Sequence, residues 1–353
     1  MKNYRGLDAP KGPWYYRVWG AVFALLVCVT IFFIWKASTK IDYVWHWERV
    51  PAYFWTNTTQ EVRSDFTGNI SEIRKEGNSN IIVLKNDNNE VKDSVAVPAD
   101  ATLHYSSGDS IYQGDVLASF PISKPGVLLQ ALWLTLWLSV LAILIGMVLG
   151  LLTGLARVSE NPALRWGAIT YIELVRGSPL LVQMYLLYFV AGPFINYALA
   201  WVTITYSELV LGSAVGVEAP VLNELWFGVL ALAVFAGAYV AEIVRAGIQS
   251  VSRGQMEAAR SLGMSYGKAM HKIILPQAFR RILPPLAGQF ISLIKDSSLL
   301  GVITVRELTK ATRDIVSSTA QPFEFWLTCA FLYLILTFTL SLFVQYLERK
   351  AVR

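Results

Sequence analysis

The sequence predicts a polytopic α-helical membrane protein with a small β-rich domain inserted between its first and second helices. Of its 353 residues, 54% are hydrophobic and 16% are charged, whereas soluble domains carry nearer a quarter of charged residues. The missing charges leave several apolar runs that are long enough to cross a hydrocarbon core of about 30 Å. Between the first two runs, residues 37–124 are polar and rich in Asn, Asp and Gly.

Six apolar runs are expected to span the membrane. They cover residues 18–35, 126–156, 166–192, 225–241, 282–305 and 325–347. The first run is longer than the apolar part of a usual signal peptide and lacks a clear Ala-x-Ala site, so we favour an uncleaved anchor over a cleaved signal peptide. Gly192 and Pro193 are expected to end the third run.

The distribution of basic residues predicts the orientation of these spans. Six crossings place both basic termini on one side. The segment between the fourth and fifth runs lies on that side too, with Arg245, Arg253, Arg260, Lys268, Lys272, Arg280 and Arg281. Because basic residues gather on the cytoplasmic side, both termini and this segment are expected inside. The net charge of +5 therefore reflects topology, and we expect no nucleic-acid partner.

The predicted organisation has three parts: a tail and anchor helix at 1–36, an outer β-rich domain at 37–124, and a membrane domain at 125–353. Runs at 81–84, 91–97 and 101–105 read as short strands, separated by turn clusters such as Asp87-Asn88-Asn89. Gly108-Asp109 and Gly114-Asp115, followed by Val116-Leu117-Ala118, loosely resemble the closing hairpin of a lipoyl-type barrel-sandwich. No Asp-Lys tip is present to carry a lipoyl or biotinyl group, so an accessory docking or spacer domain is the preferred interpretation.

One cytoplasmic segment, at about 250–281, has the form of a rigid projecting loop. Residues 256–262 are expected to form a short helix with Glu257 near its positive end and small residues at Ala258 and Ala259. Gly263 is expected to end that helix in the left-handed conformation. A second helix at 266–274 is expected to be closed by Pro276, with Ile273 and Leu275 as an apolar seat. The alternative is an ordinary amphipathic helix pair lying on the membrane surface.

The spacing of this segment is specific. Glu-Ala-Ala, three residues, Gly, nine residues and Ile-x-Leu-Pro resemble the coupling loop of permease subunits in bacterial ABC importers. The stretches 173–183 (ELVRGSPLLVQ) and 295–299 (KDSSL) are similar to those of the polar amino acid uptake permeases, which import histidine, glutamine, glutamate, arginine or opines. The resemblance covers roughly 126–353. It leaves the first span and the outer domain outside the commonest form of that family.

The resemblance implies a type I ABC importer-like core of five helices in the bacterial cytoplasmic (inner) membrane. It also implies a second permease copy or a sister permease, two ATPase subunits and a periplasmic substrate-binding protein. ATP and magnesium are expected on the partner ATPase. The chain itself has no phosphate-binding loop, because the stretch from Gly263 to Ala269 is one residue short between its glycines and ends in Ala. We therefore expect a transport subunit that is not an enzyme, with no catalytic residue, cofactor or metal of its own.

The fifth run carries two charges in the membrane, Lys295 and Asp296, which should face protein or a water-filled passage. With the hydroxyls of Ser297 and Ser298, they would suit the ammonium and carboxylate of an amino acid, and a broken helix here could aim backbone amides at the carboxylate. The alternative is that both charges pair with neighbouring helices. Arg176 and Gln183 complete the tentative passage set.

Two further pairs, Glu173 with Arg176 and Glu242 with Arg245, have the i, i+3 spacing of structural ion pairs near helix ends. The stretch from Arg176 to Pro179 is expected to kink or start a helix. Two other classes compete with the importer interpretation. A sensory membrane protein would need a cytoplasmic output domain, and an ion-coupled transporter would normally show an internal repeat.

Overall fold

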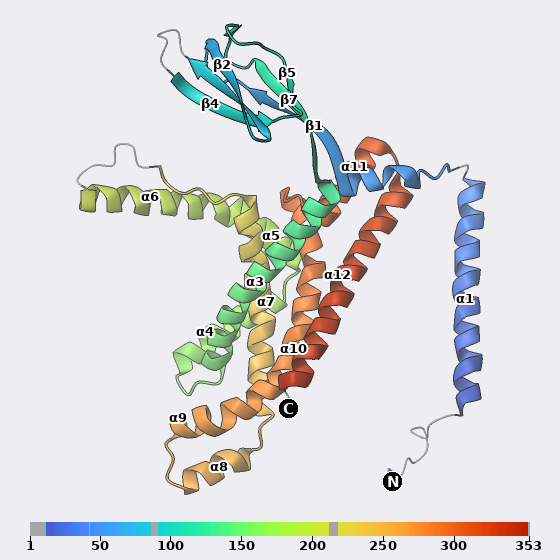
Figure 1. Cartoon of the computed structure of the whole chain (residues 1–353). Helices are drawn as coiled ribbons and strands as arrows, with labels where there is room; N and C mark the ends of the chain where they lie inside the picture. Colours follow the sequence, from blue (N-terminus) through green and yellow to red (C-terminus); the bar gives the residue numbers. More distant parts are fainter. Residues whose placement is uncertain (1–11, 42, 86–90, 212–217, 352–353) are drawn as a thin grey trace. The chain divides into compact units, whose positions relative to one another are not determined.

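The computed structural model describes residues 12–41, 43–85, 91–211 and 218–351 (Figure 1). The expected turn at Asp87-Asn88-Asn89 and the basic residues at 1–11 lie outside the described residues. The chain divides into two units, residues 1–48 and residues 49–353. The first unit consists mainly of helix α1 (Pro13–Lys40), which is apolar around its whole circumference and begins with a proline. At 1.5 Å per residue its 28 residues extend for about 42 Å, enough to cross a membrane.

The second unit begins with a short helix, α2 (Pro51–Phe54), and a β-rich module. Its strands are β1 (Trp55–Arg63), β2 (Gly68–Glu76), β3 (Ser79–Lys85), β4 (Val91–Pro98), β5 (Thr102–Leu103), β6 (Ser110–Ile111) and β7 (Val116–Pro125). They form one sheet in the order β1-β7-β5 and another in the order β4-β3-β2-β6. The strands expected at 81–84, 91–97 and 101–105 correspond to β3, β4 and β5.

The β module has its own apolar core, since Ile70, Ile82, Leu84, Ile111 and Leu117 are buried together. Its two ends are held side by side: β1 and β7 pair antiparallel from Trp55 opposite Pro125 onward. The helix that follows, α3 (Val127–Arg157), therefore begins directly at the base of this ladder. The module is tied to α3 by structure rather than by a flexible linker.

Helix α3 packs along helix α7 (Glu224–Gln249) through a row of glycines. Gly146, Gly150 and Gly154 lie one turn apart on α3. A Cβ atom built on each would come within 3.0 Å of an atom of α7. Small residues thus let the two backbones approach closely, as is common between membrane helices.

The described residues of this unit form eight further helices. They are α4 (Pro162–Arg176), α5 (Leu180–Tyr185), α6 (Gly192–Leu211), α8 (Arg253–Ser261), α9 (Tyr266–Ala269), α10 (Leu275–Asp296), α11 (Leu308–Thr319) and α12 (Pro322–Ala351). Two π-helical turns, Leu186–Ala191 and Met270–Ile274, and a 3₁₀ segment, Ser297–Ile303, join some of them. A central apolar cluster includes Leu138, Met184, Leu232, Leu293 and Leu300, from α3, α5, α7, α10 and the 3₁₀ segment.

Six helical stretches among the described residues are long and apolar enough to cross a membrane. All six overlap the expected runs. The third differs in its bounds, because the run expected at 166–192 is interrupted at Gly177-Ser178-Pro179 and the candidate span is Leu180–Val210. Gly192 and Pro193 do not end the helix: they begin α6, which turns away from the direction of α3 and α7 (Figure 1). Proline is tolerated there because it lies in the first turn of α6.

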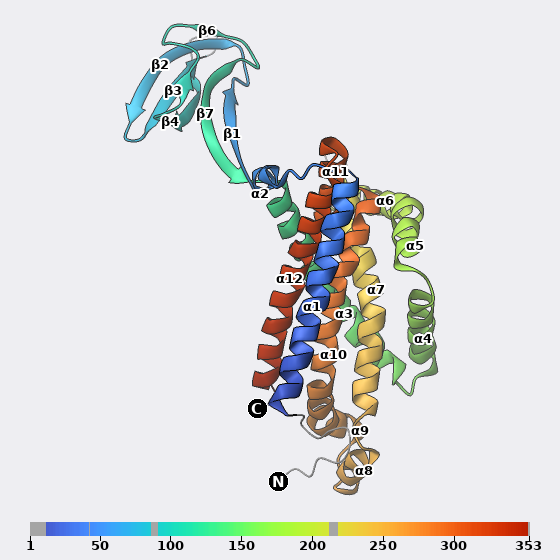
Figure 2. The ribbon, with the colours of Figure 1, turned by 90° about the vertical axis from the view of Figure 1, so that its right-hand side faces the viewer.

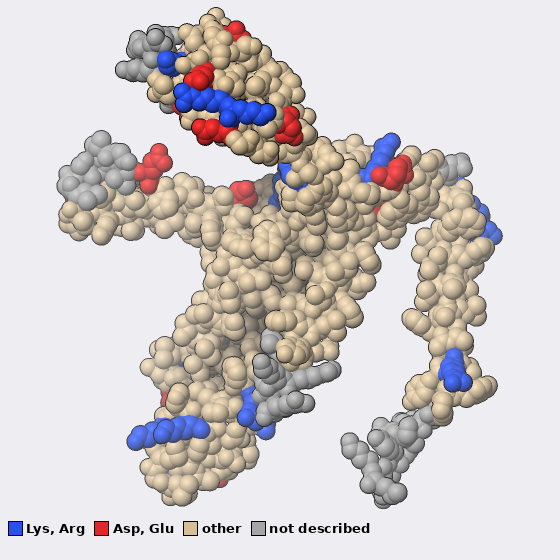
Figure 3. Space-filling model, viewed as in Figure 1, with Lys and Arg blue, Asp and Glu red and all other residues tan. Residues whose placement is uncertain are grey.

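The bundle has two distinct ends. Helices α8 and α9 lie at the end where α12 finishes, and α11 lies at the opposite end (Figure 2). On the face seen in Figure 3, the flank of the bundle between its ends shows almost no charged atoms, whereas basic side chains appear where α8 and α9 lie. This pattern agrees with an apolar band between two polar surfaces.

Candidate functional site

The projecting loop expected around Glu257 is formed by α8, a tight turn and α9. Helix α8 ends in a complete Schellman motif: the N–H of Gly263 donates to the carbonyl of Arg260 at 3.0 Å, and that of Met264 donates to the carbonyl of Ala259 at 3.1 Å. Gly263 has φ of +78°, in the left-handed region that glycine adopts without strain. The conformation predicted for Gly263 is therefore confirmed.

The loop is divided between residues that face outward and residues that anchor it. Glu257 and Ala258 are exposed, whereas Ala259 is buried. Ile273 and Leu275 pack, partly buried, against a cluster that contains Val244, Ile248 and Ile282. The apolar seat thus packs within the chain itself, and Glu257 and Ala258 lie on the outer face of α8.

Leu262, at the tip of the loop, is a residue that the sequence analysis missed. Its side chain is 82% exposed, which is unusual for a leucine beside a polar helix. The available signal was a large apolar residue directly before the glycine that ends α8. Together with Glu257 and Ala258 it gives the loop an exposed surface of mixed polarity.

The expectation that Pro276 closes the second helix is wrong. The helix passes from α9 through the π-helical turn Met270–Ile274 into α10, and Pro276 lies in the first turn of α10. The N–H that Pro276 lacks falls directly after the π-helical turn, where the regular i→i−4 bonding is already interrupted: the N–H of Leu275 donates to the carbonyl of Met270. Two polar contacts fasten the loop: Arg281 of α10 donates to the carbonyl of Ser250, and Gln277 donates to Gln255 at 3.4 Å.

The charged residues of the fifth run lie where α10 changes into the 3₁₀ segment. Lys295 is exposed and Asp296 is half-buried at the end of α10, so the regular helix does break here as expected. Ser298 is partly exposed. Ser297 is fully buried, and its hydroxyl donates to the carbonyl of Ile294 at 2.7 Å, so in this conformation the hydroxyl is not offered to a passage.

The remaining tentative passage residues occupy a break between α4 and α5. The side-chain amide of Gln183 donates to the carbonyls of Val175, at 2.6 Å, and Ser178, at 2.9 Å. Arg176 lies with its guanidinium carbon 5.3 Å from the centre of the Tyr239 ring. Helix α5 contacts the 3₁₀ segment, and among the described residues no hydrogen bond or ion pair joins Arg176 or Gln183 to Lys295 or Asp296. The stretch from Arg176 to Pro179 does kink the chain and start a helix, as predicted.

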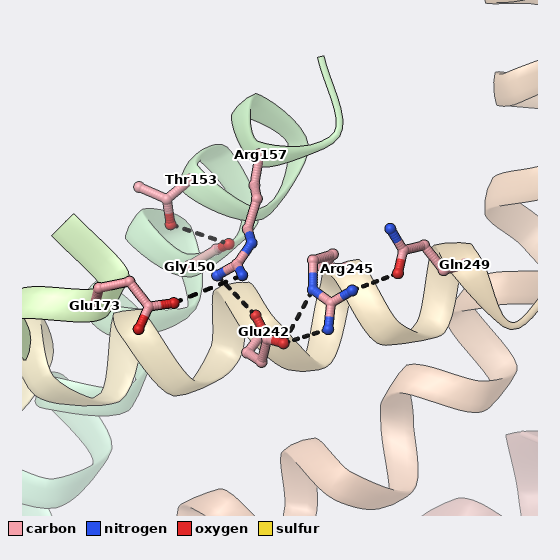
Figure 4. A network of polar contacts seen from close by, with 7 residues as sticks. All are labelled: Gly150, Thr153, Arg157, Glu173, Glu242, Arg245 and Gln249. Atoms are coloured by element: carbon pink, nitrogen blue, oxygen red, sulfur yellow. Dashed lines mark hydrogen bonds and ion pairs between the residues drawn. The ribbon is translucent and has the colours of Figure 1, made fainter. Parts of the chain in front are cut away.

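A polar network joins α3, α4 and α7 close to the loop (Figure 4). Glu242 accepts a hydrogen bond from Nε of Arg245 at 3.0 Å, which confirms that predicted pair. Glu242 also lies 3.0 Å from Nη1 of Arg157, and Glu173 lies 3.8 Å from Nη2 of the same arginine. The predicted pair of Glu173 with Arg176 is therefore wrong: each residue has a tertiary partner instead. Arg157 was missed, although a lone arginine ending an apolar helix was a usable signal.

Taken together, the apolar bundle with its glycine-packed centre and the capped loop that projects from one end describe a membrane-embedded helical protein. The family described as "Binding-protein-dependent transport system inner membrane component" matches residues 142–353. The chain belongs to this family and is a permease subunit of an ABC importer. The match begins within α3 and leaves α1 and the β module outside it.

Individual relatives agree with this assignment. The chain is 38% identical over 194 residues to the "Probable glutamine ABC transporter permease protein GlnM" of Bacillus subtilis, covering 55% of this chain and 79% of that protein. It is 37% identical over 195 residues to the nopaline transport system permease protein NocM of Agrobacterium fabrum, covering 55% and 75%. A solved amino acid ABC transporter crystallised with histidines is similar with a TM-score of 0.53 and 37% identity, over 64% of this chain and 94% of that one.

Proposed function

We propose that this permease imports a polar or charged amino acid across a bacterial cytoplasmic membrane, driven by two ATPase subunits that carry ATP and magnesium. Its relatives are named for glutamine and nopaline, and the solved relative is an amino acid transporter. A second permease copy or a sister permease would complete the passage, and a periplasmic binding protein would deliver the substrate. Both termini would lie in the cytoplasm, with residues 37–124 as an accessory periplasmic domain.

The observation that carries this proposal is the capped loop at the basic end of the bundle. An importer without its own motor must receive movement through a rigid projection. The Schellman motif at Gly263 fixes the angle of α8, and the packing of Ile273 and Leu275 joins the loop to α10. Glu257, Ala258 and Leu262 would then contact the ATPase, while Ala259 and Pro276 shape the loop.

Lys295, Asp296 and Ser298 are the residues we propose along the passage, with Arg176 and Gln183 nearby. Their support is that a charge within an apolar span requires a protein or water environment, and that Lys295 and Asp296 stand at a helix break. The accessible charges of both signs suit a zwitterionic substrate.

The coupling proposal is tested by Gly263→Val. A β-branched residue at φ of +78° is strained, although no atom lies within 4 Å of the added Cβ, so the expected defect is in backbone geometry alone. The variant should reach the membrane but co-purify with less ATPase. Gly267→Ala in α9, also in open space but without a positive φ, is the matched control.

The substrate is tested by uptake of labelled glutamine, histidine, arginine and glutamate into proteoliposomes that hold the co-purified complex. ATP-dependent uptake of one or more of them is expected.

Retention of the ATPase by Gly263→Val would contradict the proposed coupling loop. Recovery of the unaltered chain without any ATPase, or uptake of none of these amino acids, would contradict the corresponding part of the proposal.

A further inference from the structure

Helix α4 is held against the rest of the bundle by a small set of polar contacts. Of its residues, only Ala168 and Ile172 are buried. The hydroxyl of Tyr171 donates to the carbonyl of Val234 on α7 at 2.6 Å. Arg176 lies against the ring of Tyr239, also on α7. With so little apolar burial, the position of α4 depends strongly on these polar contacts.

The polar network of Arg157, Glu173, Glu242 and Arg245 reaches α4 through one contact: Glu173 of α4 lies 3.8 Å from Nη2 of Arg157 on α3 (Figure 4). Its inner members are shielded from solvent, since the side chains of Arg157 and Glu242 are 18% and 22% exposed. Although Nη1 of Arg157 and Oε2 of Glu242 are 3.0 Å apart, each of these two buried atoms lacks an aligned hydrogen bond. The contact is therefore an ion pair whose two atoms are not aligned for a hydrogen bond. This pair joins α3 to α7 and orients Arg157 toward Glu173, so its separation would also loosen the contact to α4.

The far end of α4 is built as a hinge. Gly177 follows α4, its N–H donates to the carbonyl of Glu173 at 2.8 Å, and an added Cβ would lie 2.7 Å from that oxygen. Pro179 lacks an N–H and interrupts the helical bonding two residues later. The side chain of Gln183 donates to the carbonyls left at the break. The carbonyl groups of Val175 and Ser178 at the break therefore both accept hydrogen bonds from the side chain of Gln183.

Beside the hinge there is space for movement. A mainly apolar cleft of about 300 Å³ lies between the end of α4, the π-helical turn and α7. Its walls include Leu174, Val175, Leu186, Leu187, Ala231 and Val234. A rotation of α4 about Gly177 would change the volume of this cleft without opening the main apolar cluster.

The same network is continuous with the projecting loop. Arg245 donates to Gln249, the last residue of α7, and the next residue, Ser250, accepts a hydrogen bond from Arg281 of α10. Helix α8 begins three residues further on, at Arg253. Any displacement of the loop therefore acts on the end of α7 that carries Glu242.

We propose that α4 is a hinged arm that pivots at Gly177–Pro179, and that Glu242 is the positioning residue of a latch that releases α4 when the loop moves. The drive for this movement rests on the proposed function, since the ATPase supplies it. The latch and the hinge themselves belong to the permease chain and are measurable without any partner.

The first test measures the position of α4 in the purified permease by pulsed electron spin resonance. Spin labels are attached through Gly167→Cys on α4 and Gly288→Cys on α10, two sites with no atom within 4 Å of an added Cβ. Cys28 and Cys329 are replaced in the background. Glu242→Gln should add a second distance population or broaden the first, and Arg157→Gln should do the same because it breaks the same pair. The double variant Glu242→Gln, Arg157→Gln should change the distances little more than either single variant does.

Controls separate the latch from general damage. Glu208→Gln on α6 removes an exposed carboxylate away from the network and should leave the distances unchanged. If Glu242→Gln and Arg157→Gln fail to fold, Glu173→Gln provides a milder release of α4, since the Glu173 side chain is 67% exposed. Unchanged distances in Glu242→Gln, Arg157→Gln and Glu173→Gln would overturn the latch.

The second test measures ATP hydrolysis by the co-purified complex without substrate. Release of the latch should raise this basal rate roughly five-fold, the size of a modest coupling between two sites. Altered distances with an unchanged basal rate would overturn the link between the latch and the loop. Because the spin-label experiment needs no ATPase, a failure of the proposed function would leave its result intact and the two failures distinguishable.

Discussion

Gly150 lies where α3 packs against α7, and replacing it by alanine tests whether glycine packing holds the bundle together. The added Cβ would lie 2.4 Å from Cβ of Val240, 2.5 Å from its Cγ1 and 2.7 Å from the carbonyl oxygen of Gly237. Non-bonded carbons prefer a separation of about 3.5–4.0 Å, so the added Cβ and the Cβ of Val240 would lie about 1 Å too close. Val240 is buried and β-branched, and the Gly237 contact is backbone. Neither can move aside without moving α7.

The expected cost follows from this geometry. Overpacking a filled core destabilises by about 1–3 kcal/mol, and the rigid neighbours favour the upper part of that range. The replacement also gains up to about 1 kcal/mol from the higher helix propensity of alanine. The net loss should therefore be about 1–2 kcal/mol. Because a loss of 1 kcal/mol lowers the midpoint by about 2–4 °C in chains of about 150–250 residues and by less in longer ones, the unfolding midpoint should fall by at most about 8 °C.

The assay is thermal unfolding of the purified permease in detergent, followed by size-exclusion chromatography of the soluble fraction. Gly288→Ala on α10 is the matched control, since no atom lies within 4 Å of its added Cβ. This control should leave the unfolding midpoint unchanged or raise it slightly, whereas Gly150→Ala should lower it. A midpoint for Gly150→Ala equal to that of Gly288→Ala would refute the packing argument.

Two further predictions concern the end of the bundle near the β module. Glu307 is buried and accepts hydrogen bonds from the N–H groups of Thr309 and Lys310 at the start of α11, so Glu307→Gln should cost about 0.5–2 kcal/mol. Burial raises the pKa of Glu307. The stability that this carboxyl group contributes is therefore complete below its ordinary pKa and is lost as pH rises through its pKa in the folded state. The difference in stability between wild type and Glu307→Gln should shrink from about pH 5 to pH 8, and a difference that grew would contradict this. Gly126→Ala would place a Cβ 2.3 Å from the carbonyl oxygen of Tyr53 and should loosen α2 from α3, seen as faster proteolysis near Phe54, whereas Gly12→Ala, in open space, should not.

The predictions that succeeded depend on short-range chemistry. The left-handed turn at Gly263 was predicted from the glycine that directly follows the short helix, because only glycine enters the left-handed region freely. Strand β3 follows from a continuous β-branched run, Ile81 to Val83, and strand β4 from alternating valines at Val95 and Val97. The break after Arg176 follows from Gly177 and Pro179, whose backbone limits act locally.

The predictions that failed needed information from distant parts of the chain. Glu173 has Arg176 one turn away, yet it lies nearer Arg157 of α3, because tertiary packing decides which of two cations a side chain reaches. The helix was expected to stop at Pro276, but the π-helical turn before it lets the helix continue. Whether Ser297 lines a passage stays a prediction, and packing alone determined that its hydroxyl donates to its own helix.

The β module shows the same division between sequence and structure. Its polar composition and turn clusters predict a separate β-rich region. Its attachment could not be predicted, since it depends on Tyr53 stacking edge-on against Phe325, 4.8 Å between ring centres, and on the N–H of Gly126 donating to the carbonyl of Phe54. These contacts seat α2 on α3 and α12.

By itself, the sequence indicated a helical membrane protein with a capped projecting loop, because long uncharged runs and a left-handed glycine have few physical alternatives, and its motifs indicated the ABC importer permease family. Only the tertiary structure decided which charges meet around Glu242, how closely α3 and α7 approach at Gly150, and where the β module is seated. The reason is physical: solvation and backbone limits act residue by residue, whereas ion pairing and close packing depend on which distant segments the fold brings within a few ångströms.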